Sequence, residues 1–236
     1  MADPILQLGS RGPSVKELQN LLNKQGAEPP LNPDSAFGTK TKTAVIDFQT
    51  DNWLVADGIA GKCTWNALRG FEEYVLLDEP AMLVPQPTTT TCWAASTSML
   101  KNQSIVARGP FDLASDGGLV NDSELTTPVN TAKFAAYHHL RLLPPMSWTA
   151  RGLAGLIKAH GRLMCDILWN IDNYIKGKGS SGHMVIMAGI RGDGTEDGST
   201  VEIYNPWPPS QGAIEVHNYS RLMQDIPGFT YQIYHR

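Results

Sequence analysis

The sequence has few cysteines and no long apolar run. Only three of its 236 residues are cysteine, Cys63, Cys92 and Cys165, too few and too scattered for a disulfide scaffold. No apolar run approaches the roughly 18 residues of a membrane-spanning helix. No Cys and His residues have the spacing of metal ligands, so we expect neither a metal nor another cofactor. Cys63 and Cys165 are most simply small buried side chains.

The chain also lacks an excess of positive charge and a secretion signal. Its net charge of −4 argues against nucleic acid or an anionic membrane as a partner. The first residues, Met-Ala-Asp-Pro-Ile-Leu-Gln, have neither the basic start nor the apolar core of a signal peptide. We therefore expect a protein that stays inside its cell or leaves by a route that does not read such a signal. Its length allows one or two domains, each with its own core.

An imperfect internal repeat lies within the first 70 residues. The pattern Asp-xxx-Gly-xx-Thr occurs at residues 34–41 and again at residues 57–64. Each copy predicts a turn followed by the start of a helix. Another helix is predicted after Gly12-Pro13, because apolar residues follow at helical spacing. The prediction is a three-helix unit with a small core of Leu18, Val45, Phe48, Trp65 and Leu68.

Three motifs follow one another in this region. They are Leu-Gly-Ser-Arg-Gly with Val-xx-Leu-Gln (8–19), Phe-Gly-xx-Thr-xx-Ala-Val-xx-Phe-Gln (37–49) and Asp-Gly-Ile-x-Gly-xx-Thr-Trp (57–65). In this order they resemble a small three-helix peptidoglycan-binding domain over about residues 5 to 69. The resemblance implies affinity for bacterial peptidoglycan, although such modules are sometimes retained only as spacers. The residues expected to contact peptidoglycan are Asp34, Phe37, Gly38, Asp57, Gly58 and Gly61.

The chain is predicted to divide into two domains. The helical domain covers residues 1–70, residues 71–82 form a linker that runs into the first strand of the next domain, and the second domain covers residues 83–236. Within the second domain, Cys92 begins an apolar stretch that is compatible with a helix, and Gln86 precedes it by six positions. A thiol in the first turn of a helix can have a pKa below its free value of roughly 8.5. The Gln86 amide and the Cys92 backbone N–H could together form an oxyanion hole.

A thiol nucleophile needs a general base, normally a histidine, and a group that orients it. His183 opens an apolar run of strand length at residues 184–190, and a second strand at residues 200–204 ends at Asn205. Folded as a hairpin centred near Gly194, these strands would place His183 opposite Asn205. The other five histidines have simpler explanations in helices, at a helix end, in a polar stretch or at the terminus; they are His138, His139, His160, His217 and His235.

These segments together resemble a known superfamily. Gln86-xxxxx-Cys92-Trp-Ala, then Gly-His183, then Asn205-Pro-Trp-Pro, in that order, resemble the papain-like cysteine peptidases, including compact bacterial effector proteases. The resemblance implies an α+β domain in which a helix carrying the cysteine packs on an antiparallel sheet. It also implies that Cys92 is the nucleophile, His183 the base, Asn205 its orienter and Gln86 the oxyanion donor. Compact relatives often have Asp at the position of Asn205, whereas papain has Asn.

Three other features have structural explanations. Thr91 is a possible N-cap of the helix that begins at Cys92. Residues 191–199 contain Arg-Gly-Asp and two further acidic residues, but they lack calcium-loop spacing and are most simply a solvated hairpin turn. Trp93 and Trp207 are expected to shield the site.

The resemblances predict a cysteine peptidase that is brought to bacterial cell wall by its first domain. Without a signal peptide, it suits a secreted antibacterial effector toxin delivered by a contact-dependent machine such as type VI secretion. It would be cytoplasmic before secretion, act at the wall or periplasm of a target cell, and have a cognate immunity protein. The alternatives are a wall-binding protein whose second domain only binds or performs acyl transfer, or an amidase acting on peptidoglycan stem peptides.

Overall fold

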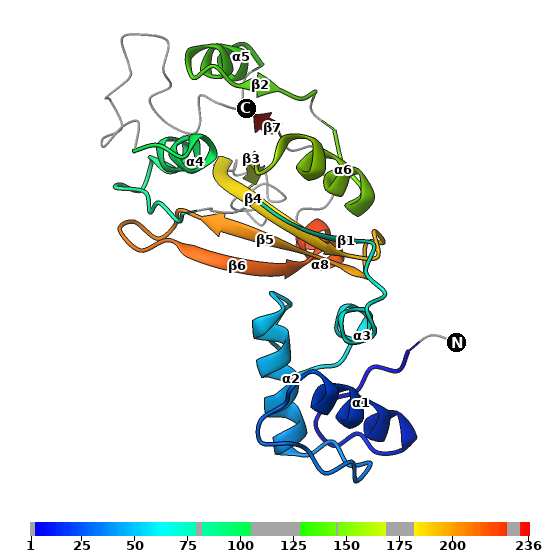
Figure 1. The fold of residues 1–236 in the computed structure, drawn as a ribbon. Coiled ribbons are helices and arrows are strands. Elements are labelled where there is room, and N and C mark those ends of the chain that lie inside the picture. Colours follow the sequence, from blue (N-terminus) through cyan, green and yellow to red (C-terminus); the bar gives the residue numbers. More distant parts are fainter. Residues whose placement is uncertain (1–2, 79–81, 105–127, 145, 169–181, 226–231) are drawn as a thin grey trace.

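The computed structural model describes residues 3–78, 82–104, 128–144, 146–168, 182–225 and 232–236. Figure 1 shows a small group of helices at the N-terminal end and a larger body in which helices pack on a sheet. The predicted fold class is therefore confirmed: an all-α unit followed by an α+β domain. None of the described helices is long and apolar enough to cross a membrane.

Three helices form the first domain. They are α1 (Pro13–Lys24), α2 (Thr39–Asp51) and α3 (Lys62–Arg69). All five residues predicted for the core are buried, and Phe37 and Ala60 join them from the turns. Pro13 begins α1, where its missing N–H has no helical partner to lose.

The sequence repeat corresponds to a repeated hydrogen-bond network around two buried glutamines, Gln19 and Gln49. In the first copy, Gln19 Nε2 donates to Asp34 Oδ1, Ala36 O and Thr41 Oγ1 at 2.9, 3.1 and 3.2 Å. In the second copy, Gln49 Nε2 donates to Asp57 Oδ1, Ile59 O and Thr64 Oγ1 at 3.0, 3.0 and 3.1 Å. Each Asp and Thr of the repeat thus satisfies a buried amide, which ties a turn to the preceding helix.

A seven-stranded antiparallel sheet forms the centre of the second domain, with the order β2-β7-β3-β4-β5-β6 and β1 paired with β4. The strands are β1 (Tyr74–Leu77), β2 (Arg141–Leu142), β3 (Leu163–Leu168), β4 (Gly182–Gly192), β5 (Ser199–Asn205), β6 (Ala213–Asn218) and β7 (Gln232–His235). β1 lies inside residues 71–82, the predicted linker, so this segment contributes to the sheet. The long strand β4 pairs with β3 and β1 on one side and with β5 on the other.

Helices cover both faces of the sheet. One cluster joins Met184, Ile186 and Ala188 of β4 to α4 (Cys92–Lys101) and α5 (Pro128–Tyr137). The other joins Val185, Met187 and Ile190 to α6 (Ala150–His160) and α8 (Tyr219–Asp225). A register shift between Met187 and Gly189 moves Ile190 onto the same face as Met187. The helix that begins at Cys92 is therefore packed on the sheet, as predicted.

The first domain contacts the turn end of the β4–β5 hairpin. The Arg191 guanidinium binds the Glu72 carboxylate, donates to the Asn52 carbonyl and lies over the Trp53 ring. Both side chains of the Arg191–Glu72 pair are at least 92% buried, with 7% and 8% exposure. The prediction of a solvated turn holds for exposed residues 195–197. It is wrong for Arg191, because the first domain and the connecting segment supply its partners.

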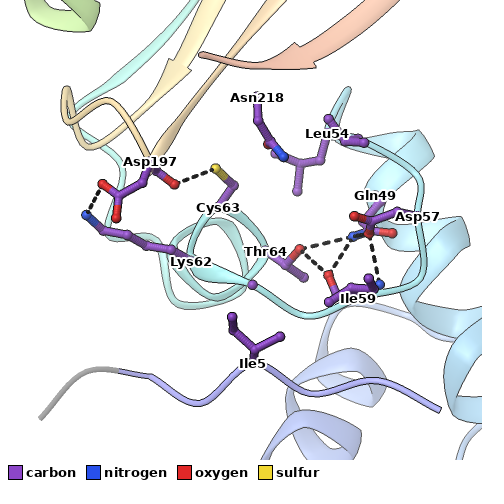
Figure 2. Close-up of a pocket in the computed structure, with 12 residues that line it drawn as sticks. Ile5, Gln49, Leu54, Asp57, Ile59, Lys62, Cys63, Thr64, Asp197 and Asn218 are labelled. Carbon is purple, nitrogen blue, oxygen red and sulfur yellow. Dashed lines mark hydrogen bonds and ion pairs between the residues drawn. The ribbon is translucent and has the colours of Figure 1, made fainter. Parts of the chain in front are cut away.

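The α3 helix makes a second set of contacts with this turn (Figure 2). Lys62 Nζ lies 3.2 Å from Asp193 Oδ2 and 3.3 Å from Asp197 Oδ1, and Asn66 Nδ2 donates to Asp193 Oδ2. Burial opposes ionisation of Asp193, but hydrogen bonds from Thr195, Lys62 and Asn66 outweigh it and lower its pKa to about 2. The stabilisation from this carboxylate is therefore complete above about pH 4 and is lost only as the pH falls toward 2.

We predict that Arg191→Ala lowers the free energy of unfolding by about 3–5 kcal/mol, since it leaves the Glu72 carboxylate buried without its partner. The matched control is Arg151→Ala. Arg151 also binds a glutamate, Glu73, but the two side chains are 57% and 46% exposed, so the expected loss is at most about 1 kcal/mol. Urea denaturation followed by tryptophan fluorescence measures both. Equal losses in the two variants would contradict the prediction.

Candidate active site

Cys92 is the first residue of α4 and is 1% exposed. Thr91 occupies the N-cap position, but its side chain does not cap the helix; its hydroxyl accepts a hydrogen bond from the Thr88 N–H at 3.0 Å. The Thr91 prediction is thus correct in position and wrong in the contact it makes. At a helix N-terminus the backbone N–H groups carry partial positive charge, which favours a thiolate.

The backbone of Met184 holds α4 against β4. Its N–H donates to Cys92 Sγ at 3.4 Å, and its carbonyl accepts from Ser96 Oγ at 2.9 Å. Cys92 and Ser96 are one helical turn apart, so they meet the two backbone groups of one residue. The β4–β5 pairing starts at Ile186, so the backbone N–H and carbonyl of Met184 bond to α4 and not to β5. The thiol is thereby placed beside the residue that follows His183.

His183 and Asn205 are in contact. His183 Nε2 lies 2.8 Å from Asn205 Oδ1, and both residues are 5% exposed. The predicted pairing register was wrong, however. Gly192 faces Ser199, so the hairpin turns between residues 195 and 196 rather than near Gly194, and Ile186 faces Tyr204. His183 and Asn205 are therefore diagonal neighbours rather than directly opposed. Diagonal neighbours remain within reach of a long or aromatic side chain.

The orientation of the Asn205 amide is set by two further hydrogen bonds. Its Oδ1 accepts from the Trp207 N–H at 3.0 Å, and its Nδ2 donates to Glu215 Oε1 at 3.0 Å. The flipped amide would set two donors against each other at Trp207 and two acceptors at Glu215. Since Oδ1 must face His183, the imidazole proton lies on Nε2. Nδ1 is then the nitrogen that can accept a proton from a thiol.

Burial and the neighbouring polar groups shift the pKa of the His183 imidazole in opposite directions. Burial lowers the pKa of His183, while the Asn205 hydrogen bond and the negative charge of Glu215 act to raise it. Burial dominates, so the imidazole is neutral at neutral pH and suited to act as a base. A hydrogen bond from His217 and another from Asn205 lower the pKa of Glu215, despite partial burial, and keep it ionised.

Glu215 is a residue of the site that the sequence analysis missed. It lies on β6, which pairs with β5 so that Asn205 faces Ala213 and Ile203 faces Glu215. A second hairpin across residues 206–212 would have placed Glu215 diagonal to Asn205 on the same face of the sheet. The alternation of Glu215 and His217 was the available signal, but His217 was assigned to a polar stretch.

Gln86 lies against the loop that follows Asn205. Its N–H donates to the Pro206 carbonyl and its own carbonyl accepts from the Ser210 N–H, both at 3.0 Å. Its side chain is buried, and Nε2 donates to the Thr88 carbonyl at 2.5 Å. Oε1 has no hydrogen-bond partner among the described residues. The Thr88 contact fixes the amide plane, and the second Nε2–H is the one that an oxyanion would take.

The six residues predicted to bind peptidoglycan lie in several settings, and one of them, Gly58, donates its N–H to Gln49 Oε1 at 2.9 Å. Asp34 and Asp57 are held by the buried glutamines, and Phe37 is 2% exposed in the core. Only Asp57 and Gly61 also line a pocket of about 190 Å³ between the second copy of the repeat and the β4–β5 turn (Figure 2). Gly38 and Gly61 are the N-caps of α2 and α3. Binding by any of the six stays a prediction.

The two other cysteines, Cys63 and Cys165, differ in burial. Cys165 is fully buried, as predicted, and burial raises the pKa of its thiol. Cys63 is only partly buried, which corrects the prediction, and its Sγ contacts the Asp197 carbonyl at 3.5 Å. Burial, with the charges of Asp193 and Asp197, raises the pKa of Cys63 to about 12. Among the residues with described positions, no group of His, Cys, Asp and Glu could hold a metal ion.

The two shielding tryptophans differ. Trp93 is fully buried and packs edge-on against Phe134 of α5, with ring centroids 6.1 Å apart. It therefore belongs to the core behind the site. Trp207 is partly exposed, and its backbone N–H contributes to the site through Asn205.

Comparison with known families identifies both parts of the chain. Residues 76–224, more than half of the chain, match the family described as papain-like cysteine protease AvrRpt2. The chain belongs to this family. Residues 11–68 match the peptidoglycan binding domain family. The predicted combination of a peptidoglycan-binding domain with a papain-like cysteine protease domain is therefore confirmed.

Individual proteins are similar over shorter stretches. A zinc D-Ala-D-Ala carboxypeptidase of Streptomyces albus G is 42% identical over 64 residues, 27% of this chain and 25% of that protein. An uncharacterized protein of Kitasatospora aureofaciens is 40% identical over 67 residues, 28% of this chain and 57% of that protein. Among solved structures, a Burkholderia AP3 phage endolysin is 45% identical, with 28% of this chain and 25% of that chain covered and a TM-score of 0.27. The chain thus spans about a quarter to just over half of the length of these curated relatives.

We predict that Ser96→Ala destabilises the second domain by about 1–3 kcal/mol, because it leaves the buried Met184 carbonyl without the Ser96 hydroxyl. Thr97→Val is the matched control on the same helix. Thr97 Oγ1 donates to the Trp93 carbonyl of the preceding turn, and its loss should cost less than about 1 kcal/mol. Both side chains are fully buried. Thermal denaturation compares them, and a larger effect of Thr97→Val would contradict the assignment.

Proposed function

We propose that this protein is a cysteine peptidase that hydrolyses peptide bonds through Cys92, His183 and Asn205. The observation that carries the proposal is the fixed order of contacts at one end of β4. Asn205 Oδ1 contacts Nε2 of the His183 imidazole. The Met184 N–H donates to the Cys92 thiol at the same end of β4. Nδ1 is left to exchange a proton with Sγ.

The reaction follows from these positions. His183 takes the thiol proton, and the Cys92 thiolate attacks the carbonyl carbon of the substrate amide. The oxyanion forms near the Gln86 amide and the backbone N–H of Cys92. The imidazolium then protonates the leaving amine as the C–N bond breaks. Water, deprotonated by His183, attacks the thioester, which releases the acid and restores the thiol.

We further propose that the first domain brings this activity to bacterial peptidoglycan. The match of residues 11–68 to the peptidoglycan binding domain family supports this. A secreted antibacterial effector would combine these properties, and its producer would then need an immunity protein. The substrate would be a protein of the target envelope or a stem peptide.

Catalysis is tested by incubating wild type and Cys92→Ala with purified sacculi and with a bacterial lysate, and mapping new amine termini by mass spectrometry. We expect termini that appear only with wild type, at a rate at least about 1000-fold above the variant, since the nucleophile is lost. Termini in stem peptides would indicate an amidase of peptidoglycan, and products joined to an added amine would indicate acyl transfer. Cleavage that is the same in both proteins, or absent from both, rules the peptidase out.

Wall binding is tested separately with the inactive full-length Cys92→Ala variant, which should sediment with sacculi. A net charge of −4 argues against adsorption through bulk positive charge. Residues 70–236 alone, which keep the Glu72–Arg191 pair, should stay in the supernatant. Full-length protein that remains in the supernatant would show that the first domain is a spacer.

A further inference from the structure

We propose that Glu215 is a positioning residue for the peptidase reaction, and that it supplies through Asn205 the negative charge that stabilises the His183 imidazolium. The inference rests on the proposed function, because it assigns a role to Glu215 within that catalytic site. The hydrogen bonds of Glu215 go to Asn205 and His217 and not to the thiol. Glu215 acts on the imidazole through the amide between them.

A continuous chain of hydrogen bonds crosses three strands, β6, β5 and β4. Glu215 Oε1 on β6 accepts from Asn205 Nδ2 at 3.0 Å, and Asn205 Oδ1 lies 2.8 Å from His183 Nε2 on β4. The carboxylate, the amide and the imidazole therefore share one polar network. The other carboxylate oxygen, Oε2, lies 3.0 Å from His217 Nε2. Glu215 is thus fixed at both oxygens.

The amide needs such a partner because it is neutral. An isolated asparagine could turn either its oxygen or its nitrogen toward His183, and the second arrangement would set a donor against Nε2–H. The Glu215 carboxylate accepts only, so together with the Trp207 N–H it selects the orientation with Oδ1 on the imidazole. It also polarises the amide, which increases negative charge on Oδ1.

The charge matters when the imidazolium forms. His183 is buried, so burial alone disfavours its cation. The described groups around it offer little other compensation. β3 places Ile167 opposite His183 with Asp166 next to it, α4 carries its first charge only at Lys101, and the loop 206–212 has no titratable side chain. On β6, His217 Nε2 lies 3.0 Å from Glu215 Oε2.

The test separates charge from shape with two changes. Glu215→Gln keeps an acceptor for Asn205 Nδ2 and removes the charge. The double variant Asn205→Asp, Glu215→Gln moves the charge next to the imidazole, while the glutamine amide can donate back to the new carboxylate. Glu73→Gln is the control, because Glu73 is exposed at the other end of the hairpin with Arg151 as its partner.

The readout is the rate at which iodoacetamide alkylates Cys92, measured by peptide mass spectrometry from about pH 4 to about pH 9. It needs no substrate, and it resolves Cys92 from Cys63 and Cys165. Transfer of the thiol proton to His183 is favoured by a nearby negative charge. Glu215→Gln should therefore lower the rate near pH 6 by roughly three- to tenfold and move the deprotonation of the imidazolium to lower pH. The double variant should return to within about twofold of wild type, and Glu73→Gln should not differ.

Each outcome decides one of the two proposals. A Glu215→Gln profile that superimposes on wild type overturns the role of Glu215, while the peptidase proposal stands. His183→Ala that reacts like wild type overturns the catalytic site itself. If circular dichroism shows that Glu215→Gln does not fold, the alkylation rate of the double variant tests the role of Glu215 instead. A rate within about twofold of wild type then supports the role, and a rate as low as that of His183→Ala overturns it.

Discussion

The pairing of β4 within the sheet is the constraint on which the rest of the structure depends. β4 is bonded to β3 and β1 along one edge and to β5 along the other, and residues 183–191 are buried throughout. The two ends of β4 make different contacts. At one end, His183 contacts Asn205, and the Met184 backbone forms hydrogen bonds with Cys92 and Ser96 of α4. At the other end, Arg191 binds Glu72 and the first domain. A strand held on both edges cannot slide, so the imidazole and the domain contact keep a fixed separation.

Much of this fold could be predicted because the signals are local. Helical spacing located the three small helices and their core, and a run of apolar residues located β4. The repeat was visible too, but its physical reason was not. Gln19 and Gln49 lie on helices 15 residues before Asp34 and 8 residues before Asp57, and nothing local marks them as the donors that bind those carboxylates. Contacts between a buried polar side chain and a distant turn depend on tertiary packing, which a single sequence does not specify.

The same distinction applies to the site. Cys92, His183, Asn205 and Gln86 could be predicted since each lies in a recognisable segment and the hairpin brings two of them together. The register was wrong by two to three positions because the hairpin turns between residues 195 and 196, and the turn-rich segment 191–199 does not mark its own centre. Arg191 was assigned to a solvated turn, since its partners lie in another domain. Glu215 was missed because its contact with Asn205 depends on a second hairpin, which pairs β5 with β6.

The position of the first domain has a consequence for substrate access. Arg191 follows His183 by eight positions along β4, so at a rise of about 3.3 Å per residue the backbone at the domain contact lies roughly 26 Å from that of His183. A first domain that binds an insoluble polymer would therefore leave the His183 end of the sheet uncovered. The contact is also polar and partly buried: an Arg–Glu pair with an adjacent lysine and two aspartates. Since the lowered pKa of Asp193 keeps it ionised well below neutral pH, the Lys62–Asp193 ion pair between the two domains persists at neutral and mildly acidic pH.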